Sequence, residues 1–139
     1  MESTMPKTAF AAGTNFKTGV ALYWILTGLF CLQMGFTAYA QLTLPQVADS
    51  FAHLGFPAWF RIELSWAKLI GIALLLAPVP SRFKEWAYAG FAINLVSAVI
   101  AHLAVGDGPE AWSFAVATSV LWGLMYFSWR RLESARVAR

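Results

Sequence analysis

The feature that most constrains this chain is a series of four apolar segments, each long enough to cross a lipid bilayer. They cover residues 19–42, 59–77, 85–105 and 111–129. Roughly 20 helical residues cross the hydrocarbon core, and only helices and closed barrels satisfy their backbone polar groups there. The sequence therefore predicts an all-α membrane protein, a bundle of four transmembrane helices.

Proline and glycine separate these segments. Pro45 and the turn at 55–57 lie between the first two, Pro78 and Pro80 follow the second, and the GDGP sequence at 106–109 follows the third. Such residues end helices and form turns. Between the first turn signals, residues 46–54 have the pattern of a short amphipathic helix at the membrane surface.

Composition and length agree with one membrane domain. Only 12% of the 139 residues are charged, against about 25% in ordinary soluble domains. We expect a polar N-terminal tail at residues 1–18, a four-helix transmembrane domain at 19–130 and a basic C-terminal tail at 131–139. The single cysteine, Cys31, excludes an intramolecular disulfide.

Basic residues predict the orientation, because short cytoplasmic segments are enriched in Lys and Arg. Eight of them fall in the two tails and the second loop: Lys7, Lys17, Arg82, Lys84, Arg130, Arg131, Arg136 and Arg139. The opposite side has only Arg61. We therefore predict that both termini are cytoplasmic. The net charge of +3 fits this asymmetry better than nucleic-acid binding.

Ionisable and amide side chains lie inside the predicted spans. A charge near the centre of a membrane helix costs about 2.5–3.5 kcal/mol on insertion scales, and the second span contains Glu63 and Lys68. At about 1.5 Å per residue, Gln33, Asn94 and His102 of the first and third spans lie at matching depths. We therefore predict a pocket bounded by the first three spans, open toward the outer face or outer leaflet, with Glu63 and Lys68 on its wall.

The predicted pocket suggests roles for its side chains. Candidate catalytic residues are Glu63 as acid or base, Lys68 as its electrostatic partner and His102 as an orienting group. The candidate substrate-binding residues are Gln33, Asn94, Trp66 and Asp107. His53 and His102 are the only histidines and have no ligand spacing, so the sequence predicts no metal site. It leaves any cofactor unspecified.

Each of these residues also has a structural interpretation. Arg61 can extend to the lipid headgroups. Glu63 and Lys68 lie about 140° apart around one helix, so each requires another helix or water as its partner. Asn94 can hydrogen-bond a neighbouring helix, and His102 can be solvated at the outer surface.

Four short sequences resemble the DoxX-like family of small bacterial membrane proteins. They are LGFP at 54–57, AKLIG at 67–71, KEWAYAGF at 84–91 and HLAVGD at 102–107. The resemblance extends over about residues 23–129 and implies a four-helix transmembrane bundle in a bacterial inner membrane. Relatives named for quinone-linked sulfur oxidation suggest a quinone or thiol connection. The position of Asn94 is often acidic in the family, so an amide here weakens any proton relay carried over from it.

Three functions remain open. The first is a site that binds an apolar quinone-, terpenoid- or sterol-like molecule. If the protein is an enzyme, this site converts the molecule by acid/base chemistry, and isomerisation by proton transfer needs no cofactor. The second is a non-catalytic subunit or chaperone of a membrane redox complex, with polar residues that join helices. The third is a transporter or proton path, which four short helices rarely form without oligomerisation. The expected partners are membrane lipid, an apolar ligand, further copies of the chain or a membrane complex, and no nucleic acid.

Overall fold

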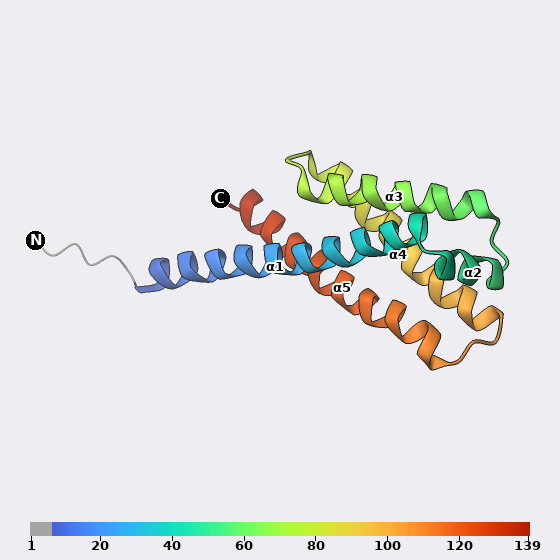
Figure 1. Cartoon of the computed structure of the whole chain (residues 1–139). Coiled ribbons are helices and arrows are strands. Elements are labelled where there is room, and N and C mark those ends of the chain that lie inside the picture. The colour runs from blue at the N-terminus through green and yellow to red at the C-terminus, as the bar shows by residue number, and fades with distance from the viewer. Residues whose placement is uncertain (1–6) are drawn as a thin grey trace, which may run out of the picture.

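The computed structural model describes residues 7–139, with side chains from residue 15 onward, and that part of the chain is helical apart from short turns (Figure 1). The helices are α1 (Lys7–Thr43), α2 (Pro45–His53), α3 (Ala58–Leu76), α4 (Ser81–Ala104) and α5 (Pro109–Val137). The all-α prediction is confirmed, and the short helix predicted at residues 46–54 is α2.

Proline and glycine define the ends of the helices. α2 begins with Pro45 and α5 begins with Pro109. The first N–H of a helix has no partner within the helix, so proline costs no hydrogen bond at this position. α3 ends before Ala77, which is extended because a proline follows it. Gly55 and Gly106, after α2 and α4, have φ values of 83° and 79°, a left-handed conformation that glycine adopts without strain.

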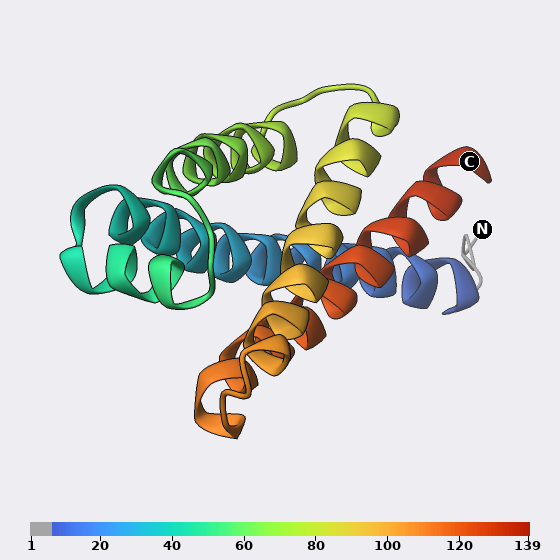
Figure 2. The same cartoon turned by 90° about the vertical axis from the view of Figure 1, so that its right-hand side faces the viewer.

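The four long helices pack in a cycle, in which α1 contacts α3 and α5, and α4 contacts the same two helices. Figure 2 shows α1 beside α3 and α4 beside α5, with the two pairs crossing. α2 packs against α1 and α3 at one end of the molecule, which we call the α2 end. The α3–α4 turn, the start of α1 and the end of α5 lie at the opposite end, the terminal end (Figure 1).

Three of these helices are long and apolar enough to cross a membrane: α1 from residue 15 to Thr43, α4 and α5. α3 carries Arg61, Glu63 and Lys68 within its 19 residues, so its length and composition alone do not mark it as a span. The chain is therefore a membrane protein with three candidate spans in its described part. A fourth span and the side of the membrane that each end faces remain predictions.

Large side chains fill the space between the helices. Each long helix contributes one nearly inaccessible side chain to the same core, namely Phe30, Leu75, Tyr88 and Met125. The Phe30 and Phe91 rings meet edge to face with centroids 5.0 Å apart. Gly71 permits the close packing of α3 on α4, because a Cβ there would lie 2.7 Å from the Phe91 ring. These contacts fix which face of α3 points inward.

The helices extend beyond their predicted bounds. Residues 7–18, predicted as a tail, are the first turns of α1, and residues 1–6 of that tail lie outside the described part. α4 begins at Ser81 instead of residue 85, and α5 continues to Val137 through the predicted basic tail. Hydropathy marks the length of a membrane crossing, whereas a helix continues into water until a proline, a glycine or the chain end stops it.

Candidate functional site

Polar side chains line the contact between α1 and α3 near the α2 end. Arg61, Ser65 and Lys68 follow helical spacing and share one face of α3, and Thr37 and Gln41 lie one turn apart on α1. Ser65 Oγ donates to Gln41 Oε1 at 3.0 Å, and an Arg61 guanidinium N–H donates to the Gln41 backbone carbonyl. Arg61 therefore joins two helices, in place of the headgroup contact that was one interpretation of the sequence.

Lys68 is the buried cation of this face. Its side chain lies in the core-facing stripe of α3, and the residue is 7% exposed. Nζ donates to Thr37 Oγ1 at 3.3 Å, and no carboxylate in the described part of the chain pairs with it. An ammonium group has three N–H donors, so one weak hydrogen bond to a hydroxyl leaves most of its capacity unused. A buried ammonium group with unused donors is stabilised by any hydrogen-bond acceptor that enters the site.

Lys68 also lines a groove between α3 and α4. The groove has a volume of about 290 Å³, and its wall is mainly apolar, with Ile70, Leu74, Trp86 and Phe91 among its side chains. Asn94 is the other polar residue of the wall; it is half-buried, and its side chain makes no hydrogen bond within the described part of the chain. The groove thus combines apolar walls with one cationic donor and one amide.

Glu63 and Trp66 lie on a different face of α3. Both are exposed, Trp66 at 57%, and neither lines the groove. The prediction of a pocket with Glu63 and Lys68 on one wall is therefore corrected. The groove holds Lys68 together with Asn94, and it lies between α3 and α4 without α1. The five-residue separation of Glu63 and Lys68 explains this, because packing of the Lys68 face on α1 turns Glu63 outward.

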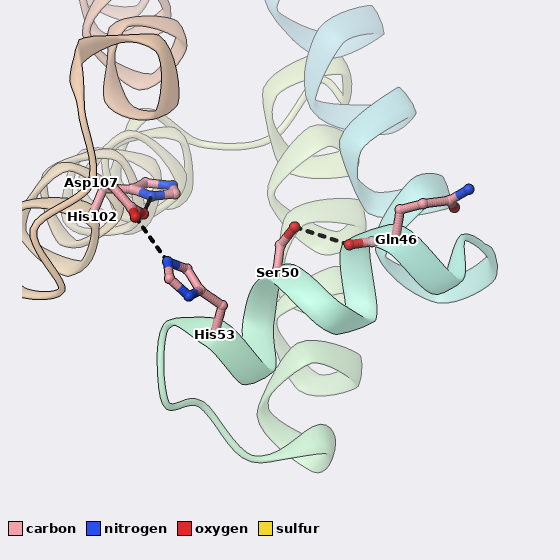
Figure 3. A network of polar contacts seen from close by, with 5 residues as sticks. All are labelled: Gln46, Ser50, His53, His102 and Asp107. Atoms are coloured by element: carbon pink, nitrogen blue, oxygen red, sulfur yellow. Dashed lines mark hydrogen bonds and ion pairs between the residues drawn. The ribbon is translucent and has the colours of Figure 1, made fainter.

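A second polar cluster lies at the α2 end (Figure 3). Asp107 bridges two histidines: its Oδ2 is 2.7 Å from Nδ1 of His102, and its Oδ1 is 2.8 Å from Nε2 of His53. These hydrogen bonds lower the pKa of Asp107 below its usual value, with the bond from His102 as the largest cause. The carboxylate therefore stays ionised and ties α2 to the α4–α5 turn.

Two glycine turns build this cluster. After α4, the Asp107 N–H donates to the His102 carbonyl at 3.0 Å across Gly106, which folds Asp107 back over the last turn of α4. After α2, the same pattern around Gly55 ends the helix directly behind His53. The contact of His53 with Asp107 was not predictable from the sequence, because residues 54 positions apart carry no local signal of contact.

The remaining candidate, Gln33, joins two helices. Its Nε2 donates to Thr118 Oγ1 of α5 at 2.5 Å. The structure therefore brings Lys68 together with Asn94, and His102 together with Asp107, and it places Gln33, Glu63 and Trp66 apart from both pairs. Within the described residues, no group of three or more His, Cys, Asp or Glu side chains is arranged to hold a metal ion.

Comparison with known proteins gives one match. The sequence model of the DoxX-like family matches residues 25–125, more than half of the chain, which confirms the resemblance seen in its short motifs. No curated protein and no solved structure matches the sequence.

Proposed function

The chain belongs to the DoxX-like family, and we propose that it is a multi-pass protein of the bacterial inner membrane. It binds the polar end of an otherwise apolar small molecule between α3 and α4. In this proposal α3 is the fourth span and both termini are cytoplasmic, as the distribution of basic residues predicts. Lys68 and Asn94 are the binding residues.

The observation that carries the proposal is the state of Lys68. A charged side chain within a membrane helix normally has a charged partner or a water-filled cavity. Lys68 is buried, has only the Thr37 hydroxyl as its partner in the described part, and lines a groove. An oxygen atom of a bound molecule would supply the missing acceptor.

The groove also indicates the class of ligand. Lys68 donates hydrogen bonds, and the Asn94 amide both donates and accepts. A carbonyl or carboxylate oxygen suits this pair, and an apolar body would pack on Trp86 and Phe91. Quinone-like molecules, and terpenoids or sterols that carry an oxygen, have this form. Because Glu63 points away from the groove, we propose binding and assign no acid/base step.

The test measures binding of a decyl-substituted benzoquinone to the detergent-solubilised protein by quenching of tryptophan fluorescence. We expect Lys68→Met to weaken binding by roughly tenfold or more, the value of a hydrogen bond to a charged donor. Asn94→Leu should weaken it less. Lys17→Met, an exposed lysine outside the groove, and Glu63→Gln should bind as the wild type does.

The melting temperature of Lys68→Met separates binding from a structural role. Replacing an unpaired buried ammonium with an apolar side chain should leave stability equal or higher. Unchanged quinone binding in both Lys68→Met and Asn94→Leu would refute the groove site. Loss of binding in Glu63→Gln would instead support the acid/base pair considered from the sequence.

A second candidate function is that of a non-catalytic subunit of a membrane complex. The observation that favours it is the use of polar residues as links between helices, in Gln33 with Thr118 and Gln41 with Ser65. In that case the exposed face with Glu63 and Trp66 would contact a partner protein, and Lys68→Met would lower the melting temperature without affecting the quinone titration.

A further inference from the structure

A second and larger cavity lies at the terminal end. It has a volume of about 490 Å³, within the range of roughly 300–1,000 Å³ typical of small-molecule sites. Its wall combines α1, the α3–α4 turn, the start of α4 and the last turns of α5. Its lining residues include Tyr23, Trp24, Leu76, Lys84, Glu133 and Arg136.

The charged residues of this cavity have a net positive charge. Lys84 and Arg136 are the cations and Glu133 is the anion. Lys84 Nζ donates one hydrogen bond, to the Leu75 carbonyl at 2.7 Å, and Arg136 Nη1 donates to Glu133 at 3.3 Å. Glu133 also accepts from Ser81 at 2.7 Å, so its charge is shared between two donors. Both cations keep N–H groups that make no further hydrogen bond among the described residues, and the Glu133 carboxylate also acts electrostatically on Lys84.

A buried tyrosine closes the inner wall of the cavity. Tyr23 lines the cavity and is 5% exposed, and its hydroxyl is enclosed beside Tyr88 instead of reaching the open space. The N–H groups available to a ligand therefore belong to Lys84 and Arg136.

The apolar part of the wall indicates where the acceptor comes from. Trp24 and Leu76 are about half exposed, on the surface that faces lipid if α1 and α3 cross the membrane. Tryptophan is typical of the depth of the lipid headgroups. A molecule whose phosphate lies in the cavity and whose acyl chains lie along Trp24 and Leu76 matches both the basic part and the apolar part of the wall.

We propose that this cavity binds the headgroup of an anionic phospholipid, with its phosphate between Lys84 and Arg136. Basic pockets between membrane helices on the cytoplasmic side are suited to such headgroups. The terminal end is the cytoplasmic end in the proposed topology, so the lipid is one of the inner leaflet. The site is separate from the α3–α4 groove and does not depend on binding there.

The test compares lipids by thermal unfolding in a neutral detergent, with added phosphatidylglycerol, phosphatidylcholine or inorganic phosphate. We expect phosphatidylglycerol to raise the melting temperature most. Arg136→Gln should raise the phosphatidylglycerol concentration for half-maximal stabilisation roughly fivefold, as expected for one cation near an anionic lipid. Lys84→Met should do the same. If loss of the hydrogen bond to Leu75 unfolds this variant, Arg136→Gln still tests the site.

Arg131→Gln is the matched control, since Arg131 is an exposed cation of the same helix that does not line the cavity. Its titration should equal that of the wild type. An equal weakening by Arg131→Gln and Arg136→Gln would show diffuse attraction to the basic surface and would overturn the site. Stabilisation by inorganic phosphate alone, as strong as by the lipid, would overturn the lipid as its source.

Discussion

At the scale of single residues, partners far apart in the sequence decide what each polar side chain does. Lys68 and Glu63 lie on the same short helix, α3, yet Lys68 is buried against α1 and Glu63 is exposed. Their position along α3 was predictable from the chain, because it follows from the number of residues between turns, whereas their depth in a membrane stays a prediction. Their direction was not predictable, because it depends on which face of α3 fits Phe91 and α1.

Asp107 gives a prediction at this scale. Its pKa is lowered from 3.8 by hydrogen bonds from His102 and His53. A carboxyl group with a lowered pKa adds stability above its unfolded pKa and loses it as the pH falls through the folded value. We therefore expect Asp107→Asn to have a lower melting temperature than the wild type at neutral pH, and this difference to shrink as the pH falls below about 3.8 and to disappear below the folded pKa.

Thermal unfolding in detergent across this pH range measures the effect. Asp49→Asn is the control, because Asp49 is an exposed aspartate of α2 without a hydrogen-bond partner in the described residues. A difference between Asp107→Asn and the wild type that stays constant with pH would show that the carboxylate charge plays no part in the cluster.

At the scale of helices, the sequence predicted the elements well and their contacts less well. Proline and glycine act locally, so the turns after α2, α3 and α4 were readable from Gly55, Pro78 and Gly106. The site was only partly predictable. Lys68 and Asn94 were both identified as polar residues inside spans, but their shared groove depends on how α3 packs against α4.

The packing of α3 on α4 gives a prediction for Gly71. An alanine Cβ at this position would lie 2.7 Å from Phe91, whose ring cannot move freely because it packs against Phe30. We expect Gly71→Ala to lower the free energy of unfolding by about 1–3 kcal/mol, the usual cost of overpacking a core.

Gly28→Ala is the matched control for Gly71→Ala. It changes a glycine in the middle of α1, where an added Cβ meets no atom within 4 Å. Unfolding by titration with a denaturing detergent should show this control to be at least as stable as the wild type, because alanine favours a helix more than glycine does. If Gly71→Ala is equally stable, the close contact between α3 and Phe91 is wrong.

At the scale of the whole molecule, the proposed topology requires α3 to cross the membrane despite its three charges. The cycle of four packed helices supports it, because α3 lies beside α1 and contacts α4. The hydrogen bonds of Arg61 and Lys68 to α1 also reduce the cost of placing these side chains in lipid. A crossing by α3 puts α2 and the α3–α4 turn on opposite sides.

The most direct measurement is labelling of single cysteines in intact cells with a membrane-impermeant maleimide, in a Cys31→Ser background. We expect Asp49→Cys in α2 to react from outside, and Ser81→Cys at the α3–α4 turn to react only after the membrane is permeabilised. Equal reactivity of the two positions from outside, or of neither, would contradict a crossing by α3, and the reverse pattern would contradict cytoplasmic termini.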